Sequence, residues 1–238
     1  PRGSGWCVGV PGEGSANGRW PTLPPMNERL ARARAGYDAV AADYAALLPD
    51  ASFEAGMDLA MIDQFVDQLP AGARVLDAGC GTGRMLGHLH ERESSLRLVG
   101  IDLSSGMLAE AARPTVPTAL VAADLAALPF DQDVFDGVLA WYSIIHVPSD
   151  ALAAAVAEMA RVLRPGGTLL FGFHAGTGER TITSAYGQPV ELTSFLHLTT
   201  DVAAAARAAG LDVDTVLDRA PRPTEKHDQG FVLAQAPK

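Results

Sequence analysis

A run of glycines at alternate positions, directly after a short apolar segment, is the feature that most constrains the fold of this chain. Residues 74–78 have the composition of a buried strand, and Gly79, Gly81 and Gly83 precede a helical pattern over residues 84–92. Glycines at such a strand-to-helix turn let the backbone approach a ligand closely and leave N–H groups available to it. In doubly wound α/β sheets, ligands bind at this edge. The run therefore predicts an α/β fold with a ligand site at the carboxyl ends of the strands.

The rest of the chain alternates between strand-like and helix-like segments, which indicates a mostly parallel sheet covered by helices on both faces. Besides residues 74–78, the predicted strands are 96–103, 119–122, 134–140, 168–173, 211–217 and 230–235, giving seven strands. The predicted helices are 28–48, 53–69, 84–92, 104–113, 150–163 and 200–209.

Composition divides the chain into an N-terminal extension and one domain. Residues 1–25 are rich in Gly and Pro, and their first four residues resemble the remnant of a cleavable expression tag, so we expect a tag-like or disordered extension. Residues 26–238 form the single domain, with a helical segment over 26–70 and a ligand-binding core over 74–173. The connection 174–198 is longer than the usual ~2–6 residues, which makes it the best candidate for a lid over a substrate.

Charge and cysteine content limit the partners. The net charge is −10 and only two lysines occur, which argues against a nucleic-acid partner. No apolar run reaches the ~18–20 residues of a membrane span, and no secretory signal is readable. Two cysteines cannot build a disulfide framework, so the cytoplasm is the expected location. No paired Cys or His spacing suggests a metal, and oligomeric state is not constrained.

The residues around the glycine run argue against a dinucleotide and favour a cofactor with a positive amino group and a ribose. A dinucleotide fingerprint needs a third glycine at position 84 or 86, where this chain has Arg84 and Leu86. Asp77 stands two residues before the first glycine, where a carboxylate suits a ligand with a positive amino group and would repel a pyrophosphate. Asp102 ends the next predicted strand, where a carboxylate can bind both hydroxyls of a ribose. A nicotinamide-dependent oxidoreductase is therefore the weakest reading.

Five motifs in order resemble those of the class I S-adenosylmethionine-dependent methyltransferases, most closely the ubiquinone- and menaquinone-biosynthesis branch. They are VLDAGCGTG at 75–83, IDLSSGM at 101–107, AADLAALPF at 122–130, FDGVLAWYSIIHVP at 135–148 and RVLRPGG at 161–167. The resemblance implies a Rossmann-like sheet whose last strand is antiparallel, an N-terminal helical lid, and S-adenosylmethionine as cofactor, with S-adenosylhomocysteine as its product.

The resemblance also implies which residues contact the cofactor. Asp77 and the glycine backbone would hold the methionine portion, Asp102 the ribose and Asp124 the adenine amino group. The positions assigned in this way are Tyr37, Tyr44, Asp77, Gly79, Cys80, Gly81, Gly83, Asp102, Leu103, Met107, Asp124, Leu125 and Ala140.

Methyl transfer requires alignment of the nucleophile with the methyl group and often removal of a proton. His146 follows the fourth core strand and is the candidate general base; the alternative is a His that orders the loop before Pro148. The candidate substrate-binding residues are Trp141, Tyr142, Tyr186 and His197, each of which has packing or surface decoration as its alternative.

We therefore expect a methyltransferase of a small-molecule acceptor, with O-, N- and C-methylation all open. The second interpretation is a protein that binds S-adenosylmethionine or S-adenosylhomocysteine without transferring a methyl group.

Overall fold

The computed structural model describes residues 28–113 and 116–238, so the predicted extension over residues 1–25 lies outside the described residues. Its helices are α1 (Glu28–Leu47), α2 (Gly56–Asp67), α3 (Arg84–Arg92), α4 (Ser105–Ala111), α5 (Leu152–Arg161) and α6 (Thr199–Ala208), with 3-10 turns η1 (Ala51–Phe53) and η2 (Ile144–His146). Its strands are β1 (Arg74–Ala78), β2 (Arg97–Asp102), β3 (Thr118–Ala122), β4 (Phe135–Trp141), β5 (Leu163–His174), β6 (Glu179–Ala185), β7 (Gln188–Phe195), β8 (Asp212–Arg219) and β9 (Gln229–Gln235).

Seven of these strands form one sheet in the order β3-β2-β1-β4-β5-β9-β8. The first five are parallel, and β9 runs antiparallel to both β5 and β8. The predicted fold class, including the antiparallel last strand, is confirmed. Because β1 lies between β2 and β4, the strand order reverses at the end of β1, and this is where the glycine run lies.

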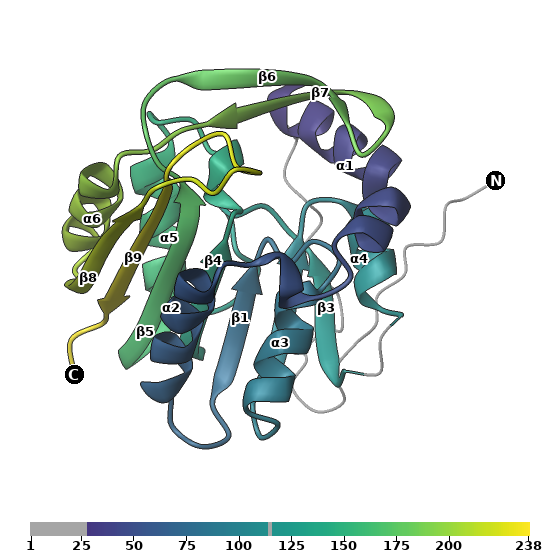
Figure 1. Cartoon of the computed structure of the whole chain (residues 1–238). Helices are drawn as coiled ribbons and strands as arrows, with labels where there is room; N and C mark the ends of the chain where they lie inside the picture. Colours follow the sequence, from purple (N-terminus) through teal and green to yellow (C-terminus); the bar gives the residue numbers. More distant parts are fainter. Residues whose placement is uncertain (1–27, 114–115) are drawn as a thin grey trace.

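Helices cover both faces of the sheet, as Figure 1 shows. On one face α2 and α3 pack onto the sheet, with Phe65 of α2 fully buried. On the other face α5 and α6 pack against fully buried Phe171 and Phe173 of β5. Each such aromatic side chain would cost about 3–5 kcal/mol of stability if truncated to alanine, so these two layers hold the sheet edge rigid under the site.

Strand β5 begins earlier than predicted. The predicted strand begins at residue 168, yet Leu163 already pairs with Phe135. The register then shifts, and regular pairing resumes at Gly137 with Thr168. The Pro-Gly-Gly run is therefore an irregularity within the strand rather than a break before it.

No strand was predicted in the connection 174–198. In the structure it contains a hairpin of β6 and β7, which forms a second sheet. Its two-residue turn consists of Tyr186 (φ 50°) and Gly187 (φ 79°), both with the positive φ of a type I′ turn. Strand β7 packs closely on α1, because a Cβ atom built on Gly36 would lie 2.6 Å from Leu192 Cδ2. In Figure 1 the hairpin and α1 extend across the top of the molecule, over the carboxyl ends of the strands.

The predicted helical lid over 26–70 divides into two parts. Helix α1 lies over the carboxyl edge and contacts α4 and β7, whereas α2 buries Met61, Ile62 and Phe65 in the core. Only α1 can therefore act as a cover. Among the described helices, none is both long enough and apolar enough to span a bilayer.

Candidate active site

A cavity of about 1040 Å³, including its open mouth, lies at the carboxyl edge of the sheet beneath α1. Most of the predicted site residues line it: Tyr37, Tyr44, Asp77, Gly79, Cys80, Gly81, Asp102, Leu103, Met107, Asp124, Leu125, Trp141, Tyr142 and His146.

Two glycines of the run are needed for the shape of the cavity. Gly79 has φ 87°, and a Cβ atom on it would lie 2.3 Å from Ser143 Cβ, so no side chain fits there. Gly81 has φ 54° with open space where its Cβ would be, and it lines the cavity. Gly83, which was also predicted to contact the cofactor, is the N-cap of α3 and does not line the cavity. Its role is therefore in the backbone turn.

Asp77, at the fourth position of β1, is the most unusual charged group in the cavity wall. Its side chain is 1% exposed, and neither carboxylate oxygen has a hydrogen-bond partner among the described residues. Burial, reinforced by the neighbouring Asp102 carboxylate and opposed by Arg84, raises the pKa of Asp77 to about 7. A buried carboxylate without partners is costly unless a ligand supplies them.

Asp102, at the end of β2, is held by the backbone around it. Its Oδ2 accepts a hydrogen bond from Gly81 N at 2.9 Å, and its Oδ1 accepts one from Ser104 N at 2.8 Å. Burial raises the pKa of Asp102 even though these hydrogen bonds act in the opposite direction. The carboxylate therefore ties the glycine loop to the start of α4 while its remaining lone pairs line the cavity.

The far end of the cavity combines apolar and polar groups. Leu103, Met107 and Leu125 line it together with Asp124, whose Oδ1 accepts a hydrogen bond from Ala126 N at 3.0 Å. This apolar slot beside one carboxylate suits an aromatic ring that carries hydrogen-bond donors.

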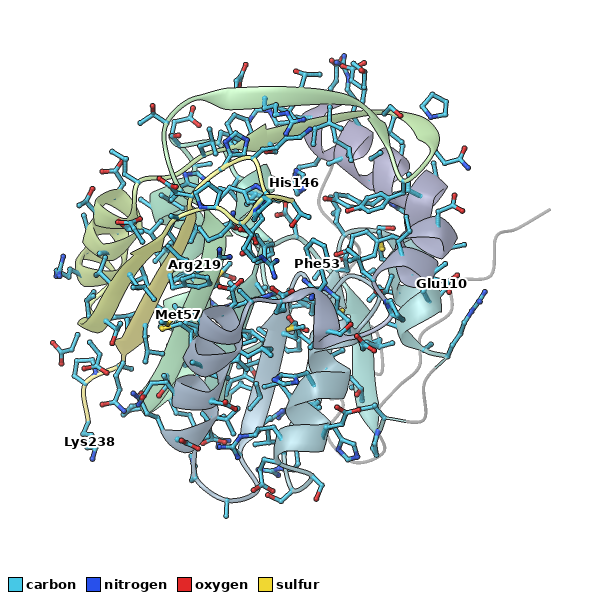
Figure 2. All side chains as sticks on the ribbon, viewed as in Figure 1. Phe53, Met57, Glu110, His146, Arg219 and Lys238 are labelled. Carbon is cyan, nitrogen blue, oxygen red and sulfur yellow. The ribbon has the colours of Figure 1, made fainter. Side chains whose placement is uncertain are left out.

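His146, the last residue of η2, lies under the roof formed by α1 and the β6–β7 hairpin (Figure 2). Both of these elements contact its ring. Its Nδ1 lies 2.8 Å from the Thr193 carbonyl oxygen of β7, and its Nε2 lies 2.6 Å from the Tyr37 hydroxyl of α1. Because a carbonyl can only accept, Nδ1 carries the proton and Nε2 accepts from Tyr37. Burial lowers the pKa of His146, so the imidazole is neutral near pH 7. Both covering elements therefore orient this ring.

The sequence interpretation did not identify Arg84, Glu54 or Ser143 as site residues. Arg84 lines the cavity, pairs with the buried carboxylate of Glu54 and hydrogen-bonds with Tyr44. Its position directly after the glycine run could have indicated that Arg84 is a site residue. The sequence analysis used Arg84 only as evidence against a dinucleotide fingerprint. The Ser143 hydroxyl lines the cavity and has no hydrogen-bond partner among the described residues.

The predicted substrate-binding residues are only partly brought together. Trp141 and Tyr142 line the cavity, and Tyr142 has a positive φ of 53°, which is rare for a bulky residue. Tyr186 packs against Tyr44 at a ring distance of 4.8 Å, behind the cavity wall. His197 is 3% exposed, and its Nε2 lies 3.1 Å from the Ile144 carbonyl oxygen, so it supports η2 from below. Ala140, assigned to the cofactor, is also buried beneath the wall rather than in it.

No group of three or more His, Cys, Asp or Glu side chains in residues 28–113 and 116–238 is arranged as metal ligands.

Comparison with known proteins agrees with the family resemblance. Residues 75–167 match the family described as a methyltransferase domain. Malonyl-[acyl-carrier protein] O-methyltransferase of Enterobacter lignolyticus is 38% identical over 151 residues, which is 63% of this chain and 55% of that protein. Demethylmenaquinone methyltransferase of Mycobacterium bovis is 42% identical over 99 residues, or 42% of this chain and 40% of that protein. The chain thus spans about half the length of the curated relatives it matches, or less.

Solved structures share the fold. One is the 1,6-didemethyltoxoflavin-N1-methyltransferase of Burkholderia thailandensis with bound 1,6-didemethyltoxoflavin and S-adenosylhomocysteine, with a TM-score of 0.68, 23% identity, and coverage of 92% of this chain and 94% of that one. Another is a [4+2]-cyclase, with a TM-score of 0.66, 18% identity, and coverage of 91% and 99%. Because the second protein is named for a different reaction, the fold alone does not determine the chemistry.

Proposed function

We propose that this chain, whose residues 75–167 match the methyltransferase domain family, is an S-adenosylmethionine-dependent methyltransferase of a small-molecule acceptor. The observation that carries the proposal is Asp77, a buried carboxylate that faces the cavity without a partner among the described residues. S-Adenosylmethionine carries an ammonium group and a sulfonium, so it would supply the missing positive charge. When bound, it also supplies a methyl group activated for in-line displacement.

The remaining wall residues fit the other parts of the same cofactor. We assign the ammonium to Asp77, the ribose hydroxyls to Asp102, and the adenine to the slot beside Asp124. The carboxylate end is assigned to Arg84 and Tyr44. Two arginines line the cavity, Arg34 and Arg84, and of these Arg84 stands at the N-terminus of α3, where backbone N–H groups also favour an anion. Asp77 and Arg84 would then recognise the two charges of an amino acid.

His146 and Tyr37 are assigned to proton removal from the acceptor. The neutral Nε2 of His146 is the only unprotonated nitrogen of that ring, and the Tyr37 hydroxyl occupies it. A proton leaving the acceptor would pass to the Tyr37 oxygen while the Tyr37 proton moves to Nε2. This assignment replaces the predicted contact of Tyr37 with the cofactor. The roof formed by α1 and the β6–β7 hairpin would exclude water and hold both residues in line.

A small-molecule acceptor, rather than nucleic acid, rests on the net charge of −10. The name of one relative, demethylmenaquinone methyltransferase, is compatible with it. A cytoplasmic location, based on the cysteine content, remains a prediction.

The first expected result is that S-adenosylhomocysteine binds and stabilises the protein. At 100 times its dissociation constant the free energy of unfolding should rise by about 2.7 kcal/mol. Thermal unfolding with and without the ligand measures this, with NADH as the control that should have no effect. An unchanged melting temperature with S-adenosylhomocysteine at millimolar concentration would remove the cofactor assignment. Binding without methylation of any acceptor would instead favour a binding protein.

The second expected result concerns Asp102. The variant Asp102→Ala should bind S-adenosylhomocysteine at least about tenfold more weakly, because a hydrogen bond to a charged group contributes roughly 1.5–3 kcal/mol. Titration calorimetry measures the affinity, and circular dichroism checks that the loss of the contacts to Gly81 N and Ser104 N has not unfolded the domain. A folded variant with wild-type affinity would show that Asp102 supports only the loop.

A further inference from the structure

The inner face of the β6–β7 hairpin carries a cation that the proposed chemistry does not use. Exposure alternates along the first five residues of β6, where Arg180 and Ile182 are the less exposed positions. They pair with Ser194 and Leu192 of β7, which are 4% and 2% exposed. Because directly paired residues in an antiparallel ladder project from the same face, Arg180 lies on the buried face of the hairpin.

Arg180 has no ion pair or hydrogen bond from its side chain to any residue in the described part of the chain, unlike the other arginines of this region. Arg84 pairs with Glu54, and Arg219 pairs with Asp58 at 2.6 Å and Glu225 at 2.8 Å. A half-buried guanidinium without a counter-charge is unfavourable, so an anionic ligand would stabilise it.

His174, whose pKa is lowered in part by Arg180, lies beside a residue of the cavity wall. The His174 ring lies 5.3 Å from the ring of Tyr142, which lines the cavity, and 5.8 Å from the ring of His227. His174 Nδ1 is buried and has no hydrogen-bond partner among the described residues.

Arg180 is the unpaired cation among the charged groups that act on His174. Burial, together with His227, His146 and Arg180, lowers the pKa of His174 to about 4, and Glu225 acts in the opposite direction. Glu225 is already paired with Arg219 and Arg222. Arg180 is thus the cation of this group that has no ion-pair partner among the described residues. A single guanidinium balances one carboxylate, whereas a phosphate monoester at pH 7 carries a charge of about −1.5 to −2.

We propose that Arg180 binds a carboxylate of the methyl acceptor, which is therefore a carboxylic acid that also carries a separate hydroxyl or amino group. The inference rests on the proposed function and adds the acceptor class to it. The carboxylate would receive the paired N–H groups of Arg180 and lie beside His174, and the second group would face Tyr37 and His146. The nucleophile is the second group rather than the carboxylate, because a base is useful only to a nucleophile that carries a proton.

The test compares three small probes that share one ring: benzoate, benzamide and phenyl phosphate. Ligand-observed NMR on the whole chain, with and without S-adenosylhomocysteine, gives their affinities. Benzoate should bind at least about tenfold more tightly than benzamide. The preference should fall below about twofold in Arg180→Gln and be partly kept in Arg180→Lys. Arg207→Gln, which removes an exposed arginine of α6, is the matched control and should keep the wild-type preference.

A second readout needs no variant. Adding benzoate to the wild-type protein should shift the side-chain NMR signals of His174 and His227, while those of His88 and His90 on α3 stay in place.

The outcomes separate the two proposals. Binding of S-adenosylhomocysteine without an Arg180-dependent preference for benzoate would overturn this inference and leave the proposed function standing. The reverse result would preserve the carboxylate site and remove the methyltransferase. Tighter binding of phenyl phosphate than benzoate would overturn the carboxylate assignment in favour of a phosphorylated acceptor.

Discussion

Replacing His146 by asparagine is expected to lower turnover by about 10²–10⁴-fold while cofactor affinity stays near the wild-type value. The ring lies in the cavity wall with its unprotonated Nε2 toward Tyr37, and asparagine cannot supply a nitrogen base there. The measurement is kcat at saturating S-adenosylmethionine with any acceptor that the wild-type protein methylates, alongside calorimetry with S-adenosylhomocysteine.

The pH profile separates a base from a residue that only orders the loop. Burial lowers the pKa of His146, and the neutral form is the base. The wild-type rate should therefore rise with pH through this lowered pKa, below the ordinary value of about 6.5, and then stay level. The variant should lose this inflection.

Tyr37→Phe is the companion variant, since it removes the hydroxyl that lies 2.6 Å from Nε2 and keeps the ring. A loss comparable to that of His146→Asn supports the relay through Tyr37. Near-normal turnover and an unchanged pH profile in His146→Asn would exclude His146 as the base.

Asp77→Asn is expected to act in opposite directions on binding and on stability. Removing one charge of a buried pair typically costs 2–5 kcal/mol, so affinity for S-adenosylhomocysteine should fall by about 30-fold or more. The unliganded protein should become more stable above pH 7, because the variant no longer holds a buried carboxylate without partners.

The sign and size of the stability effect follow from the pKa. Folding raises the pKa of Asp77 from 3.8 to about 7, so the folded state binds its proton more tightly than the unfolded state. Wild-type stability from this group is complete below pH 3.8 and is lost as pH rises to about 7, by roughly 4 kcal/mol at 1.36 kcal/mol per unit. An unsatisfied amide would offset about 1–3 kcal/mol of the gain.

Denaturant unfolding of both proteins between pH 5 and 8 measures the difference, which should grow with pH and level off. Asp63→Asn is the matched control, because this carboxylate on α2 is 49% exposed and its loss should give no such growth. A difference that does not depend on pH, together with wild-type affinity, would mean that Asp77 is not the cation-binding group.

The site was predictable where the chain itself fixes the geometry. A glycine turn after a buried strand needs its special backbone wherever it occurs, so Gly79, Gly81 and the acids Asp77 and Asp102 could be placed from spacing alone. Parallel strands carry their carboxyl ends to one edge, so Trp141 and His146 follow from the same alternation, whereas Asp124 was assigned from the family resemblance.

The predictions that failed concern residues whose positions depend on contacts between distant segments. His197 and Ala140 belong to predicted site segments, but their burial is set by packing beneath η2 and β4. The hairpin was read as a loop because its turn residues, Tyr186 and Gly187, lack the Asn-Gly signal and its strands have few apolar residues to mark them.

The sequence by itself determined the sheet, its glycine turn and the row of acids at its edge, because these depend on local backbone conformation and on the period of apolar residues. Only the tertiary structure decided that Tyr37, 109 residues from His146, meets Nε2 of that ring, and that Thr193 fixes Nδ1. It also decided that Arg180 lies on the buried face of the hairpin, where none of the described residues forms an ion pair with it. These contacts form when α1 and the β6–β7 hairpin pack over the carboxyl edge of the sheet. Packing and charge determine which residues meet there, and no spacing in the sequence does.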